Sequence, residues 1–130
     1  MPKRLHFHLS RCESQIMDIV YRLGEANAEE VRKHMPDPTS YNSVRVTMGI
    51  LEQKGYLTHR LDGNKNVYRP TTPVDTAKRS ALRHVLSTFF GGSAPKAVST
   101  LLDMSASELS EDELKELARL IETARKERSR

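Results

Sequence analysis

The chain has 130 residues, of which 37% are apolar and 29% charged, and its mean hydropathy is −0.60. This length is close to that of one domain and excludes a second full catalytic domain. No apolar run approaches the roughly 20 residues of a membrane span, and a single cysteine, Cys12, excludes a disulfide framework or a cysteine-rich zinc site.

No apolar stretch typical of a secretory signal follows the basic residues at the start of the sequence. We therefore expect a cytoplasmic protein without membrane insertion.

The charge is unevenly distributed along the chain. Up to residue 90 there are 14 lysines and arginines against 9 aspartates and glutamates, whereas beyond it there are 7 against 8. With a sequence pI near 9.4, an acidic polymer is a natural partner for the basic part, because clustered cations attract phosphates. An ordinary basic protein surface is an equally good reading of the charge alone.

Two helices are predicted before the first prolines of the central region. Ser10, with Glu13 three residues later, forms a capping box that opens the first helix, and Gly24 ends it. Cys12 lies on its apolar stripe, where we expect it to be buried as a small hydrophobe. A weaker capping pattern begins a short second helix over residues 28–34.

A third helix is predicted from about residue 41 to residue 54. Its core side is formed by Val44, Met48 and Leu51. The opposite face holds Asn42, Arg45, Val46, Gly49 and Gln53. This face has no carboxylate, so it could approach phosphates and base edges without repulsion. Arginine pairs with guanine, an amide pairs with adenine, and valine can contact a thymine methyl. A plain solvated helix surface is the alternative.

Two short strands are predicted next, over residues 56–61 and 66–69, around a loop at 62–65. Three cations lie on this hairpin: Arg60, Lys65 and Arg69. A short helix, a break, a longer helix and a hairpin is the order of a winged helix-turn-helix, whose second helix of the pair enters the major groove. The three cations are also compatible with a solvated wing.

Three further helices are predicted. The fourth has Thr72 as its N-cap and Pro73 as its first residue, the fifth covers residues 93–104, and the sixth opens at a capping box at Ser110. We expect fraying from Lys126 onward. The predicted fold class is mainly α (α+β), with a winged helix-turn-helix at residues 1–71 and a three-helix dimerisation region at 72–130.

The last helices carry apolar faces that need a cover, because the winged helix is already a complete module. The candidate dimerisation residues are Phe89, Val98, Leu101, Leu102, Leu114, Leu117 and Ile121. A second copy is the simplest cover, and its two-fold symmetry predicts a pseudo-palindromic operator. The alternative is that these helices fold back on their own domain, with Phe89 in its core.

Catalytic and metal signatures are missing from the sequence. It has no recognisable Ser-His-Asp set, no glycine-rich phosphate loop, and no metal-ligand spacing among its five histidines. We expect no enzyme activity, no metal and no cofactor.

Three stretches carry a resemblance to a known family: LSRCESQIMDIVYRLGEANAEEVRKHM, SYNSVRVTMGILEQKGYLTHRLDGNKNVYRPTTP and KRSALRHVLSTFFGGSAPKAVSTLLD. Together they resemble the penicillinase-repressor (BlaI/MecI/CopY) family over roughly residues 9–124. The most specific parts are VYRP at the end of the wing and FFGGS at residues 89–93.

The resemblance implies a homodimer that represses operators upstream of resistance or stress genes. It places the family's recognition-helix contacts on Asn42, Ser43, Arg45 and Val46, and the wing contacts near Lys65. It also implies a membrane-bound sensor protease as a partner that triggers cleavage in antibiotic-inducible members.

Three positions depart from the family pattern. Many members carry Thr at the position of Val46 and Arg at that of Ile50, so the operator is expected to differ. The Cys-x-Cys array of the copper-responsive branch is absent, which argues against copper sensing by that route. The Asn-Phe cleavage bond of inducible members corresponds here to Asp103-Met104.

The sequence thus favours a homodimeric repressor bound to a double-stranded DNA operator. A winged helix that binds an acidic protein partner, without reading a DNA sequence, is the alternative. Charge pattern alone does not separate the two.

Overall fold

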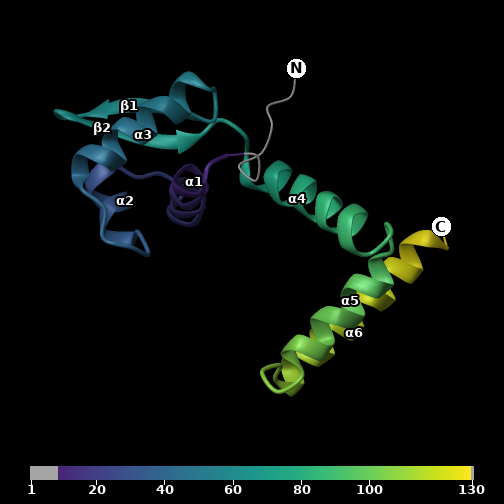
Figure 1. The fold of residues 1–130 in the computed structure, drawn as a ribbon. Helices are drawn as coiled ribbons and strands as arrows, with labels where there is room; N and C mark the ends of the chain where they lie inside the picture. Colours follow the sequence, from purple (N-terminus) through teal and green to yellow (C-terminus); the bar gives the residue numbers. More distant parts are fainter. Residues whose placement is uncertain (1–8, 130) are drawn as a thin grey trace. The chain divides into compact units, whose positions relative to one another are not determined.

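The computed structural model describes residues 9–129, and in this part the chain forms six helices and one two-stranded antiparallel sheet. The elements are α1 (Arg11–Leu23), α2 (Ala28–His34), α3 (Tyr41–Gln53), β1 (Leu57–Asp62), β2 (Lys65–Pro70), α4 (Val74–Phe89), α5 (Ala94–Ser105) and α6 (Glu111–Arg128) (Figure 1). The predicted fold class, a mainly helical winged helix, is confirmed. Two compact units divide between His84 and Val85, inside α4. The boundary predicted after residue 71 stays a prediction.

The core of the first unit lies between α1, α2 and α3 and is closed by the hairpin, which lies against α1 and α3 (Figure 1). Val44, Met48 and Leu51 are fully buried, as their spacing predicts. Leu57 and Tyr68 of the hairpin join the same core. Because one face of α3 is used by this core, its other face is left to solvent.

Local capping starts α1 and α2. The Glu13 amide donates to Ser10 Oγ over 3.2 Å, and the Ser10 amide donates to Glu13 Oε1 over 3.0 Å, which is the predicted capping box. Asn27 makes the same reciprocal pair with Glu30. Cys12, which we expected to be buried, is only half-buried, because it lies at the edge of the core.

Glu13 also ties α1 to the end of α3. Its carboxylate is buried and accepts a 2.7 Å hydrogen bond from Lys54 Nζ. This bond, helped by the Ser10 amide, lowers the pKa of Glu13 below its ordinary value of 4.5. The folded state therefore gains stability from the ionised carboxylate above the unfolded pKa and loses it as the pH falls through the folded pKa.

We expect Glu13→Gln to lower the free energy of unfolding by about 1 kcal/mol at pH 7. The difference from the unmodified chain should begin to shrink below about pH 4.5 and vanish once the pH has fallen through the lowered pKa of folded Glu13, because that carboxylate is then protonated. Urea unfolding followed by circular dichroism at several pH values measures this. Lys54→Met is the matched control: it should remove the same pH-dependent contribution, and the double variant should lose little more. A difference that is constant from pH 7 to pH 3 would contradict the assignment.

The β1–β2 hairpin, here called the wing, runs in register from Leu57 opposite Pro70 to Asp62 opposite Lys65. The predicted four-residue loop is in fact a two-residue turn, Gly63-Asn64, and each strand reaches one residue further toward the tip. Gly63, the first residue of the turn, has a φ of +67°, whereas Asn64 does not have a positive φ, because only glycines have one in the described part. A positive φ at the first turn residue alone is the pattern of a type II′ turn.

An isolated bridge anchors the wing to the segment between α1 and α2. Ala26 and Tyr68 exchange both backbone hydrogen bonds, at 2.9 and 2.8 Å. The sequence does not predict this bridge, because a single paired residue leaves no periodic pattern.

The start of α4 differs by one residue from the prediction. The helix begins at Val74, and the carbonyl of Pro73 accepts the first bond, from the Ala77 amide at 3.0 Å. The Thr72 carbonyl instead accepts the Tyr21 hydroxyl at 3.1 Å, so Thr72 is held by α1 and not by the helix.

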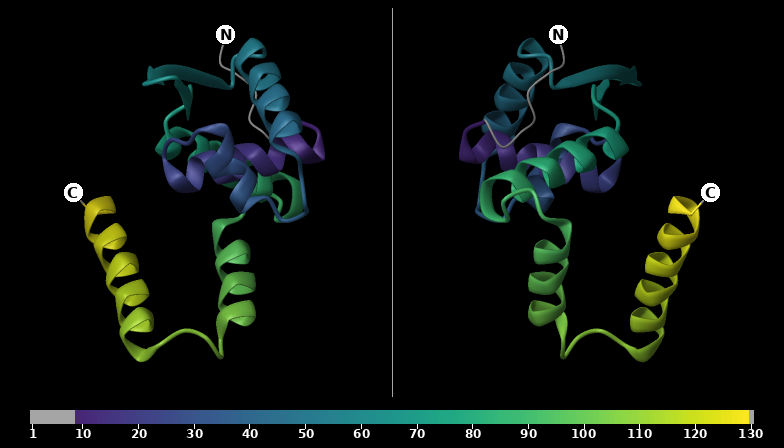
Figure 2. Two further views of the ribbon diagram at one scale, coloured as in Figure 1. Left: turned by 90° about the vertical axis from the view of Figure 1, so that its left-hand side faces the viewer. Right: turned by 90° about the vertical axis from the view of Figure 1, so that its right-hand side faces the viewer.

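In the second unit, α5 and α6 leave their shared turn and diverge (Figure 2). Ser110 caps α6 as predicted. The fifth helix lies one residue further along the chain than predicted, because Ser93 is its N-cap and accepts from the Lys96 amide. The expected fraying from Lys126 is wrong: α6 continues to Arg128, because Ser129 bonds the free carbonyl of Arg125 through both its amide and its hydroxyl. No residue between 78 and 129 is buried.

No helix of the described chain has both the length and the apolar character to cross a membrane.

Candidate nucleic-acid interface

The outward face of α3 presents polar and apolar groups side by side. Asn42, Arg45 and Val46 are all exposed, as the sequence predicts. Arg45 Nη2 donates to Asn42 Oδ1 over 2.9 Å, so the guanidinium and the amide are held together on this face. Nothing lies within 4 Å of where a Cβ on Gly49 would stand, which leaves a gap on this side of the helix.

Ser43 is exposed at the same end of α3 but is engaged in the helix cap. Its amide donates to Ser40 Oγ over 3.1 Å, and its hydroxyl oxygen accepts the Ser40 hydroxyl at 3.0 Å. A contact from Ser43 to a ligand would therefore use the hydroxyl hydrogen as a donor or the second lone pair of the hydroxyl oxygen as an acceptor.

Glu52, the one carboxylate in α3, is turned toward the wing. Its Oε2 lies 2.6 Å from Nδ1 of His59 on β1. The His59 ring in turn lies 5.3 Å from that of Tyr68. The exposed face of α3 is thus free of negative charge, and the acid of this helix links it to the wing.

The wing places its three predicted cations differently. Lys65 and Arg69 are exposed. Arg60 is half-exposed and donates through Nη2 to Glu25 over 2.8 Å, so in this structure its charge is matched by a neighbour. A DNA contact from each of the three stays a prediction, and for Arg60 it would require the pair with Glu25 to open or be shared.

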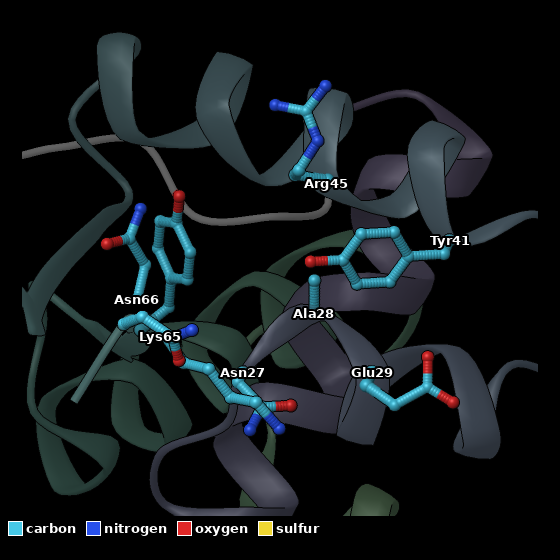
Figure 3. Close-up of a pocket in the computed structure, with 9 residues that line it drawn as sticks. Asn27, Ala28, Glu29, Tyr41, Arg45, Lys65 and Asn66 are labelled. Carbon is cyan, nitrogen blue, oxygen red and sulfur yellow. The ribbon is translucent and has the colours of Figure 1, made fainter. Parts of the chain in front are cut away.

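A cavity of about 460 Å³ lies between α3, the start of α2 and the tip of the wing (Figure 3). The lining residues are Asn27, Ala28, Glu29, Tyr41, Arg45, Asn64, Lys65, Asn66 and Tyr68. Tyr41 projects its hydroxyl toward the side of the wing residues, and the Arg45 guanidinium points away from Ala28 (Figure 3). Polar groups from three elements therefore surround one opening.

Glu29 is the carboxylate of this cavity, and its charge is balanced. Arg32 donates to it from Nε over 3.0 Å, and this bond, with smaller contributions that include Lys65, lowers the pKa of Glu29. The carboxylate is ionised at neutral pH but paired, so it does not leave the cavity with an excess of negative charge.

Sequence reasoning missed one exposed side chain of α3, Tyr41, which is 50% exposed. Helical spacing could have found it, because residues four apart share a face and Tyr41 precedes Arg45 by four. Ile50, which the comparison with the family pattern singles out, is 41% exposed and follows Val46 by four.

The predicted dimerisation residues are accessible in the single chain. Phe89, Val98, Leu101, Leu102, Leu114 and Ile121 are exposed, and Leu117 is half-buried. Asp103 and Met104, the predicted cleavage pair, are exposed near the end of α5. Residues 9–129 contain no group of three or more histidine, cysteine or acidic side chains placed to hold a metal ion.

The family model described as penicillinase repressor matches residues 9–123 of the chain. The chain belongs to the penicillinase repressor family. This family consists of DNA-binding transcriptional regulators. The resemblance inferred from the residues is thereby confirmed.

Among solved structures, the chain is similar to TrmBL2, an archaeal chromatin protein described as showing a novel mode of DNA binding. The two share 21% sequence identity with a TM-score of 0.43, over 82% of this chain and 40% of that one. The chain thus spans less than half the length of that protein. No curated protein is similar enough in sequence to count as a match.

Proposed function

We propose that this penicillinase repressor family member is a cytoplasmic homodimer that binds a pseudo-palindromic operator and thereby occludes a promoter. In this proposal α3 enters the major groove and the wing contacts the neighbouring backbone or minor groove. The observation that carries it is the exposed face of α3, where Asn42 and Arg45 are held together and the carboxylate of Glu52 is turned away.

The cavity beside α3 supports a path for the sugar-phosphate backbone. With α3 in the major groove, the strand that borders the groove would pass between Tyr41 and the wing tip. Lys65 and Asn66 would then be placed to contact phosphate oxygens. Such contacts position the protein and make its affinity depend on salt, but carry no sequence information.

Dimerisation is supported by the uncovered apolar side chains of the second unit. α5 and α6 diverge and bury no side chain of their own, although both carry leucines (Figure 2). Leaving this many apolar groups in water is unfavourable, and a second copy supplies the complementary face through two-fold symmetry.

Inactivation by proteolysis in the C-terminal region is part of the proposal. Asp103 and Met104 are exposed, and a cut there would separate the winged helix from the predicted dimerisation residues of α6, which are Leu114, Leu117 and Ile121. Because this pair replaces Asn-Phe, a membrane-bound sensor protease acting on this chain would need a different bond preference.

The proposal is tested by selection from a pool of randomised duplexes with the full chain at physiological salt. Enrichment of one pseudo-palindromic sequence is expected. Binding to all duplexes alike, or to none, would overturn the proposal and favour the alternative of a winged helix that binds an acidic protein.

Lys65→Ala is expected to weaken binding to all duplexes to a similar degree and to reduce the slope of log affinity against log salt by about 1 for each protomer. The reason is that a phosphate contact releases bound counterions whatever the sequence. Fluorescence anisotropy between 50 and 200 mM salt measures it. Lys115→Ala on α6, an exposed lysine outside the winged helix, should leave the slope unchanged. A loss restricted to one sequence would contradict a phosphate role for Lys65.

A further inference from the structure

Two aliphatic side chains are exposed to solvent on the face of α3 that would enter the major groove in the proposed function. Val46 is 46% exposed and Ile50 is 41% exposed. Since they are four residues apart in one helix, they are neighbours on its surface. Single exposed aliphatic residues are common. This pair lies between the hydrogen-bonding groups of the same face, and that position calls for an explanation.

The surroundings of the pair favour close contact with a duplex. Gly49, between the two in sequence, leaves open space beside the helix. Arg45 adds a positive charge next to Val46, while Glu52 is held by His59. DNA suits this face better than an acidic protein does. The face combines apolar groups with a positive charge, and Arg45 and Asn42 also supply hydrogen-bond donors for base edges.

Valine and isoleucine have no donor or acceptor, so they cannot read the hydrogen-bonding pattern of a base pair. The apolar group that the major groove offers is the C5 methyl of thymine. We propose that Val46 and Ile50 form one methyl-reading surface, which makes operator binding depend on thymine at defined positions of each half-site. The inference rests on the proposed function and specifies which bases that function selects.

The spacing of the pair limits where the thymines lie. Four residues of helix advance by about 6 Å, and successive bases of one strand are about 3.4 Å apart along the duplex axis. The two side chains therefore reach methyl groups on the same or neighbouring base pairs, at most about two steps apart. A half-site selected by this chain should contain thymines within that distance.

The test uses the full chain and the duplex that it selects from a randomised pool. Each thymine is replaced in turn by deoxyuridine, which lacks only the methyl group. We expect a loss of affinity of about threefold to fivefold at one or two positions of each half-site, the value for one buried methyl group, and no loss elsewhere.

Val46→Ala and Ile50→Ala make the test specific for these residues. Each variant should bind the thymine and deoxyuridine duplexes equally well at the position that its own side chain reads. Val74→Ala, which truncates a valine that is 60% exposed on α4, is the matched control and should keep the full sensitivity to deoxyuridine.

Two outcomes overturn the inference and leave the proposed function intact. One is equal binding of thymine and deoxyuridine duplexes by the unmodified chain at every position. The other is a loss with deoxyuridine that is the same in the unmodified chain and in both alanine variants, because the methyl would then be read by another group. If no duplex is selected at all, both the proposed function and the inference fail.

Discussion

Leu117→Asp combined with Ile121→Asp is expected to convert the proposed homodimer into monomers. The two side chains are one turn apart on α6. In the single chain Leu117 is half-buried and Ile121 is 59% exposed, so the monomer tolerates a carboxylate at both positions. In a dimer interface the same carboxylates would lose their hydration without a partner, which is strongly unfavourable. Light scattering should report a mass near 14.8 kDa for the variant and about twice this for the unmodified chain.

The same variant should lose operator affinity, because the two winged helices would no longer bind as a linked pair. We expect a loss of about 100-fold or more in an anisotropy titration. Lys115→Asp combined with Arg119→Asp, also one turn apart but on the polar side of α6, is the matched control and should remain dimeric. An unchanged mass for the Leu117 and Ile121 variant would refute the interface.

Arg45→Ala should weaken binding to the selected operator by about 1–3 kcal/mol and relax the selectivity at one base position. The guanidinium is already oriented by Asn42, so little further ordering is needed when it pairs with a guanine. A gel-shift competition against duplexes with single base changes measures both effects. Because the folded core uses the other face of α3, the stability of the variant should be unchanged.

Arg45→Lys separates charge from geometry. Lysine keeps the positive charge but lacks the planar pair of donors, so it should restore general binding and not the selectivity. Arg83→Ala, an exposed arginine on α4, should leave the titration unaltered. If Arg45→Ala binds the selected operator as well as the unmodified chain does, Arg45 does not read a base.

Local sequence determined where the helices of this protein begin and which side of α3 is buried. The capping boxes at Ser10, Asn27 and Ser110 act within four residues of chain. The spacing of Val44, Met48 and Leu51 places them on one face whatever surrounds the helix. Asn42, Arg45 and Val46 could be predicted as exposed for the same reason, since they lie opposite that stripe.

Tertiary structure decided how the charges around this face are paired and how the wing is anchored. Three ion pairs join residues 7, 35 and 41 positions apart: Glu52 with His59, Arg60 with Glu25, and Lys54 with Glu13. The Ala26–Tyr68 bridge joins the segment between α1 and α2 to β2. No periodic pattern reports such pairs, because each depends on where separate elements meet after folding. Periodicity shows which side chains share a helix face, but only packing shows which charges there are already matched and which remain for a ligand.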